Sequence, residues 1–102
     1  MAELLAMYPQ PDNLEHFDDY YWNNHIPLVK KMPGLQLLEV SNGPVQGSDG
    51  NSPYYLVARM TWESVEMMQS SLNSEEGKTA SADVENFAPK GSIVLVFDTA
   101  RA

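Results

Sequence analysis

Apolar side chains recur every three or four residues between residues 14 and 32, a spacing that places them on one face of a helix. That face consists of Leu14, Phe17, Tyr21, His25, Leu28 and Met32. Asp12 is a suitable N-cap for this helix, and Glu15 three residues later completes a capping-box pattern. The Pro33-Gly34 pair ends the helix. The predicted helix therefore carries an ionisable imidazole, His25, on its buried face, whereas His16 lies on its solvent side.

Four strands are predicted around this helix, over residues 2–8, 35–40, 54–62 and 92–98. A short helix over residues 63–72, and a helical piece that Ser74 caps and that reaches about Phe87, lie between the third and fourth strands. The turn-rich segment 41–53 joins the second and third strands as a long hairpin loop. This order predicts a single α+β domain over residues 1–102, with a ferredoxin-like βαββαβ layout and an antiparallel four-stranded sheet.

The predicted strands are apolar on both faces. In residues 54–62 one face presents Tyr54, Leu56, Ala58, Met60 and Trp62, and the other presents Tyr55, Val57, Arg59 and Thr61. An antiparallel sheet that helices cover on one side is normally polar on the other. We therefore predict a homodimer in which two sheets pack face to face as a dimeric α+β barrel. The alternative is a monomer with an unusually apolar open sheet.

Composition narrows the classes of function. The 102 residues are 43% hydrophobic, which suits a globular domain, and the formal net charge of -8 argues against nucleic acid or an anionic membrane as partner. The chain has no cysteine, so disulfides, thiolate metal sites and cysteine nucleophiles are excluded. We expect a reducing, cytoplasmic location, with neither a signal peptide nor a membrane span.

The surroundings of His25 indicate where chemistry could take place. Pro27 lacks an N–H and its ring clashes with the carbonyl of Asn23, so the helix is expected to kink or break there. The carbonyls that this frees need donors, which the Asn23 and Asn24 side chains or His25 itself can supply. Tyr21 lies one helical turn before His25, within reach of its side chain. The alternative role for His25 is a core histidine that binds a backbone carbonyl.

The motif Tyr21-x-x-x-His25-x-Pro27-Leu28 with its Pro33-Gly34 stop resembles the EthD-like proteins. Downstream residues fit the same pattern in order and spacing: Trp62-Glu63-Ser64, Ser74-Glu75-Glu76-Gly77, Asp83 and Phe87. The resemblance implies a dimeric α+β barrel with a cavity between sheet and helices. The family takes its name from a protein needed in bacterial ethyl tert-butyl ether degradation. Its wider superfamily contains cofactor-free monooxygenases, cyclases and isomerases, together with some haem-degrading proteins.

Seven residues are candidates for the site. His25 is the expected acid/base and Tyr21 its partner, and the substrate-binding candidates are Asn24, Arg59, Trp62, Tyr54 and Asp83. Arg59, in mid-strand, is expected to meet an anionic ligand or, alternatively, a carboxylate such as Glu39. Trp62 and Tyr54 are candidate aromatic walls of the pocket, with the core or the dimer interface as the alternative. Asp83 matches an acidic position of the family pattern, with a helix cap or surface charge as the alternative.

We therefore expect a cytoplasmic, homodimeric, cofactor-independent enzyme of small-molecule metabolism that binds a small apolar or aromatic oxygenated ligand. Leu, Met, Tyr, Trp and Phe side chains dominate the expected lining of its pocket. Three other hypotheses remain open: a non-catalytic ligand-binding or accessory dimer, a purely structural dimer and, less favoured, haem binding through His25. No spacing of residues indicates a metal site or a phosphate-binding loop.

Overall fold

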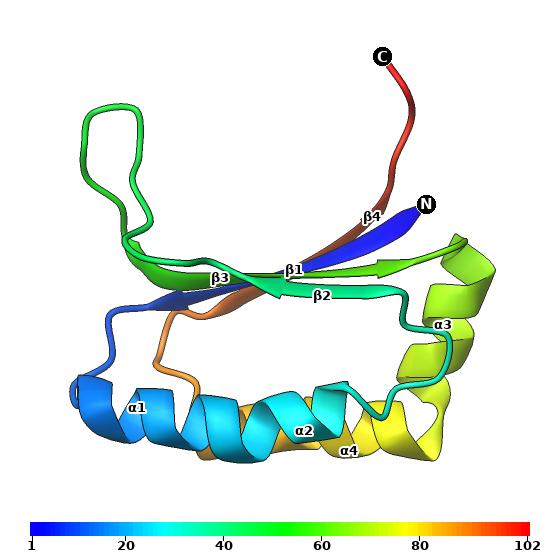
Figure 1. Cartoon of the computed structure of the whole chain (residues 1–102), viewed down its shortest axis with the longest axis horizontal. Helices are drawn as coiled ribbons and strands as arrows, with labels where there is room; N and C mark the ends of the chain where they lie inside the picture. The colour runs from blue at the N-terminus through cyan, green and yellow to red at the C-terminus, as the bar shows by residue number, and fades with distance from the viewer.

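The computed structural model describes all 102 residues and confirms the predicted α+β layout. Four strands form one antiparallel sheet in the order β2-β3-β1-β4: β1 (Ala2–Pro9), β2 (Leu37–Val40), β3 (Tyr54–Trp62) and β4 (Ile93–Asp98). One face of the sheet is covered by α1 (Leu14–Tyr20), a π-helical turn η1 (Tyr21–His25), α2 (Ile26–Val29) and α4 (Glu75–Asp83) (Figure 1). Helix α3 (Val65–Asn73) stands at one end of the sheet, and a 3-10 turn η2 (Val84–Asn86) follows α4.

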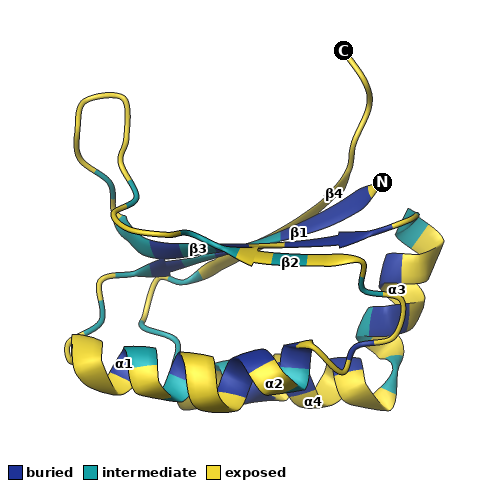
Figure 2. Cartoon of the chain, in the orientation of Figure 1, coloured by how far each residue is buried: buried dark blue, intermediate teal, exposed yellow.

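The hydrophobic core lies between this sheet and the helices. Strands β1 and β3 contribute alternate side chains to it, because successive side chains of a strand point to opposite faces. The buried members from these strands are Ala2, Leu4, Ala6, Tyr8, Leu56, Ala58, Met60 and Trp62. Phe17, Tyr21, Ile26 and Val29 pack against them from the helical layer. The central strand β1 is thus held between two neighbours, while the edge strand β4 lies beyond the helical cover and is exposed along its length (Figure 2).

The start of the first helix differs from the prediction by one residue. Asn13, not Asp12, is the N-cap: its backbone is extended, and its side-chain oxygen accepts a hydrogen bond from the His16 amide at 3.0 Å. No capping box forms, because the residue three positions after Asn13 is His16 rather than a glutamate. The prediction that Ser74 caps the next helical piece is confirmed, because its hydroxyl accepts from the Gly77 amide at 3.0 Å.

A π-helical turn, rather than a break, accommodates Pro27. The amide of Ile26 donates to the carbonyl of Tyr21, five residues back, and the helical path then continues into α2 with Pro27 in its first turn. One residue more per turn advances the buried face, so His25 and Ile26 are both buried. The simple helical stripe is wrong at its beginning, where Leu14 is 39% exposed.

The start of β3 also departs from simple alternation. Tyr8 pairs with Leu56 and Pro9 with Tyr54, so the register shifts and Tyr55 has no residue opposite it. The Tyr55 ring therefore packs 5.8 Å from that of Phe17, and its hydroxyl donates to Asp18 of α1. The prediction that Tyr55 belongs to the outer face, with Val57 and Arg59, is wrong for this reason.

The other face of the sheet has no cover in the single chain. Residues that pair across β1 and β4 on this face are Leu5 with Leu95 and Met7 with Ile93, and all of β4 is exposed. The 41–53 loop and the C-terminal residues also extend on this side, away from the helices (Figure 1). The sequence prediction of a sheet with an uncovered apolar face is therefore confirmed.

Candidate functional site

A cavity of about 230 Å³ lies between the helical layer and the inner face of the sheet. Fourteen of its 16 lining residues are hydrophobic, and they come from β1, β2, β3, β4, the helix around His25, α3 and α4. Ser81 of α4 and Val94 of β4, which is 52% exposed, belong to the lining, so the mouth opens between these two elements. The site is therefore apolar, and its mouth lies beside the edge strand β4, on the helical side of the sheet.

His25 lines this cavity, and Asp83 fixes its orientation. The imidazole is buried, with Nδ1 at 3.0 Å from Asp83 Oδ2. The π turn presents His25 and the end of α4 presents Asp83, so the pair joins two helices 58 residues apart in the sequence. The ring of Phe87 packs at 4.5 Å from the imidazole, between ring centres. No hydrogen bond within the chain occupies Nε2, which leaves that atom for a ligand.

The carboxylate of Asp83 is itself held in place. Its Oδ1 accepts from the Tyr20 hydroxyl at 2.6 Å and from the Asn86 amide at 3.0 Å. Burial by itself raises the pKa of Asp83, but hydrogen bonds from Tyr20, Asn86 and His25 outweigh it and bring the pKa below its usual value. Asp83 is therefore an ionised acceptor at neutral pH.

Burial and the ionised Asp83 carboxylate together determine the protonation state of His25. Burial lowers the pKa of His25, and the opposing influence of Asp83 does not restore it, so the ring is neutral at pH 7. An ionised carboxylate only accepts hydrogen bonds, and it therefore places the single ring proton on Nδ1. Nε2 then carries a lone pair toward the cavity. A neutral imidazole oriented by a carboxylate is the arrangement of a general base.

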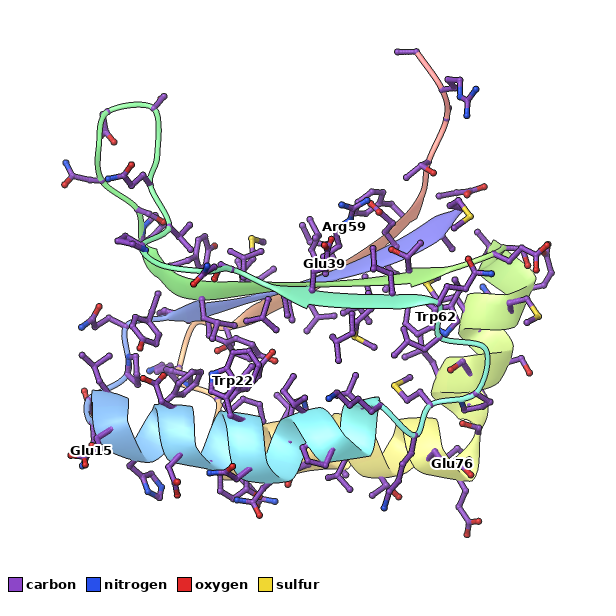
Figure 3. All side chains as sticks on the ribbon, viewed as in Figure 1. Glu15, Trp22, Glu39, Arg59, Trp62 and Glu76 are labelled. Atoms are coloured by element: carbon purple, nitrogen blue, oxygen red, sulfur yellow. The ribbon has the colours of Figure 1, made fainter.

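The structure brings three of the seven sequence candidates together. His25 and Tyr21 line the cavity with their ring centres 5.7 Å apart, and Asp83 binds His25 from behind rather than lining the cavity itself. Asn24 is exposed on the helix, and neither Tyr54 at the start of β3 nor Trp62 at its end lines the cavity. Trp62 is fully buried near α3, where the Cβ of a side chain at Gly34 would contact it (Figure 3).

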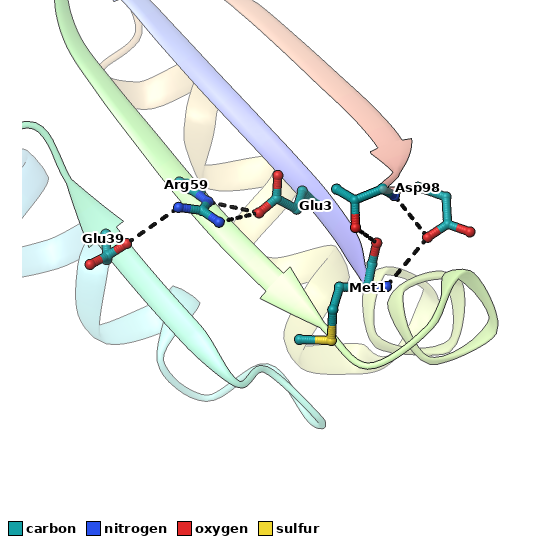
Figure 4. Close-up of polar contacts among 6 residues, drawn as sticks. Met1, Glu3, Glu39, Arg59 and Asp98 are labelled. Carbon is teal, nitrogen blue, oxygen red and sulfur yellow. Dashed lines mark hydrogen bonds and ion pairs between the residues drawn. The ribbon is translucent and has the colours of Figure 1, made fainter. Parts of the chain in front are cut away.

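Arg59 points to the opposite side of the sheet from the cavity (Figure 3). Its guanidinium contacts Glu3 at 2.6 Å and Glu39 at 3.7 Å, so one cation links β1, β3 and β2 (Figure 4). The expected carboxylate partner Glu39 is thus present, but Glu3 is the nearer one. Successive side chains of a strand point to opposite faces. Arg59 lies between the inner-face residues Ala58 and Met60, so its side chain points to the outer face.

Sequence reasoning missed Tyr8 as a residue of the site. Tyr8 lies at the end of β1, is 2% exposed, and lines the cavity beside Tyr21, with ring centres 5.6 Å apart. Its aromatic character and its place on the buried face of a strand were the available signals. They did not distinguish a core tyrosine from a cavity tyrosine, because that depends on how far the helices stand from the sheet.

No three His, Asp or Glu side chains come together in a way that could hold a metal ion. Among the helices, none combines the length and the apolar character needed to cross a bilayer.

The fold and the cavity together define a class: ferredoxin-like α+β domains with an apolar pocket between helices and sheet. Within this class the chain belongs to the EthD family, because the model of the EthD domain matches residues 10–91. A relative from Rhodococcus erythropolis, an uncharacterized 11.0 kDa protein in a thcB-thcC intergenic region, is 33% identical over 99 residues, covering 96% of this chain and 94% of its own.

Solved structures agree with this assignment. An EthD family protein from Bacillus halodurans is 34% identical, with a TM-score of 0.87 and coverage of 98% of this chain and 99% of its own. Two more distant structures share the fold. SnoaB, a cofactor-independent oxygenase from Streptomyces nogalater, is 10% identical with a TM-score of 0.67, covering 99% and 94%. A dimeric ferredoxin-like protein of unknown function from Thermobifida fusca is 11% identical with a TM-score of 0.70, covering 96% and 90%.

Proposed function

We propose that this protein is a homodimeric, cofactor-independent, cytoplasmic enzyme that removes a proton from a small, mostly apolar, oxygenated molecule. The observation that carries the proposal is the neutral His25 imidazole, whose Nδ1 is held by Asp83 and whose Nε2 is left for a ligand in an apolar cavity. Because burial lowers the pKa of His25, the imidazole is unprotonated at neutral pH and so able to accept a proton.

The size of the cavity bounds the ligand. A 150 Å³ cavity of apolar lining holds benzene, so by proportion about 230 Å³ accommodates roughly nine non-hydrogen atoms. This volume is below the ~300–1,000 Å³ typical of sites for drug-sized ligands. A monocyclic or small bicyclic compound fits, whereas a haem does not fit the cavity as it stands. We therefore propose no step that involves haem.

The uncovered face of the sheet supports the homodimer. Leu95 is 47% and Phe97 40% exposed, and both lie on the face opposite the helices beside Leu5 and Glu3. An exposed apolar patch on a small domain is a site of association. A ferredoxin-like protein of the same fold is dimeric, which favours the same assembly here. The Glu3, Arg59 and Glu39 cluster also lies on this face.

A substrate-independent measurement of base strength tests the proposal. The probe is 2-indanone, a small bicyclic ketone with exchangeable protons beside its carbonyl, incubated in D2O and followed by proton NMR. We expect the wild type to accelerate deuterium exchange above the buffer rate, and His25→Gln to lose about 10²–10⁴-fold of that acceleration. Gln approximates the volume of imidazole and one of its hydrogen bonds, but it does not accept a proton near neutral pH.

His16→Gln is the matched control, because His16 is exposed on the outer side of α1. Its exchange rate should equal that of the wild type. If wild type and His25→Gln bind 2-indanone equally and exchange it at the buffer rate, the base assignment is wrong and the protein is a binding dimer.

A further inference from the structure

Two tyrosine hydroxyls in the cavity have no partner within the chain. Tyr8 of β1 and Tyr21 of η1 are 2% and 1% exposed, both line the cavity, and neither hydroxyl takes part in a hydrogen bond. Two nearby tyrosines outside the cavity behave differently: Tyr20 donates to Asp83 and Tyr55 donates to Asp18. Buried hydroxyls normally find a partner, so a pair left free at the same cavity requires an explanation.

The open space that these hydroxyls reach is the cavity itself. The buried polar side-chain atoms that lack both a partner and contact with open space are Thr61 Oγ1, Trp62 Nε1 and Ser71 Oγ. Neither tyrosine hydroxyl is among them, so each retains contact with space outside the packed core. Because both residues are buried and line the cavity, that space is the cavity. The rings of Tyr8 and Tyr21 meet edge to face at 5.6 Å, and Tyr21 lies 5.7 Å from His25.

Both hydroxyls are donors throughout the neutral range. Burial raises the pKa of Tyr8 to about 12, and burial together with the neighbouring Tyr8 raises that of Tyr21. Two neutral O–H donors in an apolar cavity beside a base provide the surroundings that stabilise an oxygen which gains negative charge during a reaction. Two hydrogen-bond donors stabilise a neutral oxygen less than they stabilise a negatively charged one.

We propose that Tyr8 and Tyr21 form an oxyanion site, and that the substrate is an enolisable carbonyl compound whose oxygen binds between the two hydroxyls. This inference rests on the proposed function of His25 as the base. The C–H bond next to the carbonyl breaks and its proton goes to Nε2 of His25. The electron pair of that bond forms a C=C bond, and the carbonyl π pair moves to the oxygen, where both hydroxyls donate hydrogen bonds. Return of the proton from the imidazolium to a conjugated carbon completes isomerisation. In D2O the imidazolium first trades its proton for a solvent deuteron, and delivery of that deuteron to the same carbon completes exchange.

Binding of an enolate mimic tests the oxyanion site independently of His25. The probe is 4-nitrophenol, whose phenolate absorbs visible light, titrated with protein across its own ionisation range. We expect the wild type to bind the phenolate and to lower the apparent pKa of the probe. Tyr8→Phe and Tyr21→Phe should each weaken phenolate binding by about 10- to 100-fold, because each removes one hydrogen bond to a charged oxygen. Since neither hydroxyl has a partner within the chain, both variants should keep the melting temperature of the wild type.

Tyr55→Phe is the matched control, because it removes a hydroxyl that lies outside the cavity and binds Asp18. It should bind the phenolate as the wild type does. His25→Gln should still bind it, which separates this inference from the base assignment.

Exchange of 2-indanone supplies the second readout. Removing one donor of an oxyanion site costs about 10²–10³-fold in rate, so Tyr8→Phe should lose that much while its affinity for the neutral ketone changes little. The inference is overturned if folded Tyr8→Phe and Tyr21→Phe bind the phenolate as tightly as the Tyr55→Phe control. Loss of exchange in His25→Gln together with unchanged phenolate binding in both tyrosine variants would retain the base and reject the oxyanion site.

Discussion

Replacing Asp83 by Asn changes one atom in the carboxylate and is expected to disable the base. Asp83 accepts three hydrogen bonds, from Tyr20, Asn86 and His25 Nδ1. An amide offers a single oxygen and an NH2 group, so three donors can no longer all be satisfied. If the amide oxygen stays with Tyr20 and Asn86, the NH2 group faces His25. Nδ1 must then accept, and the ring proton moves to Nε2, where it removes the lone pair from the cavity.

The magnitude of the effect depends on which way the new amide turns. In a serine protease the equivalent aspartate-to-asparagine change leaves the geometry intact and lowers kcat about 10⁴-fold, because the histidine adopts the wrong tautomer. We expect a loss of the same order in the exchange of 2-indanone. If the amide instead turns its NH2 group toward Tyr20 and Asn86, a buried donor is left unsatisfied, at about 1–3 kcal/mol of stability. For a domain of this size that lowers Tm by roughly 5–20 °C.

Two measurements on the same sample distinguish the two orientations of the amide. Long-range nitrogen–proton NMR of ¹⁵N-labelled histidine reports which ring nitrogen carries the proton, and we expect Nδ1–H in the wild type and Nε2–H in Asp83→Asn. Thermal unfolding reports the stability. Asp18→Asn, which alters the carboxylate that Tyr55 binds outside the cavity, is the matched control and should change neither tautomer nor exchange. An Asp83→Asn variant with the Nδ1–H tautomer, full exchange activity and the melting temperature of the wild type would refute the reasoning.

The pH dependence of stability, the π turn and the uncovered sheet face can each be tested separately. Burial holds the pKa of folded His25 below its unfolded value of 6.5, so the unfolded state binds more protons and stability falls as pH drops from 6.5 toward the folded pKa. The lowered pKa of Asp83 causes a second loss of stability below pH 3.8. In urea titrations, His25→Gln should lack the first loss and keep the second. Pro27→Ala supplies an amide hydrogen and removes the ring that favours the π turn, so calorimetry should show equal or higher stability. Exchange of 2-indanone should fall because the His25 side chain changes direction. Unchanged exchange would show that the π turn is not needed for the site. Leu95→Asp places a charge on the uncovered sheet face and should reduce the sedimenting mass toward the 11.4 kDa monomer. Val94→Asp, at the cavity mouth, is the control and should leave the dimer intact. A wild type that sediments as a monomer at micromolar concentration rules out the dimer.

Local rules predicted most of the secondary structure. The bounds of β3 agree with the prediction to the residue, and those of β1 and β4 to within one residue at a single end, because strand alternation and proline or glycine punctuation act over a few neighbours. The inward direction of His25 followed in the same way. The uncovered apolar face also followed, since both faces of β4 are apolar in a chain with too few helices to cover them.

The site itself was decided by the tertiary structure. The contact between His25 and Asp83 joins residues 58 positions apart, and it depends on how α4 packs beside the π turn. Tyr8 became a cavity residue through the way the helical layer packs on the inner face of the sheet, which no local pattern records. Arg59 and Trp62 were predicted as ligand contacts, and the alternation of β3 together with its pairing partners places them elsewhere. The sequence by itself thus determined the elements and the buried faces, because these depend on near neighbours. The tertiary structure alone decided which side chains meet around an empty volume, because such contacts depend on packing between segments far apart in the chain.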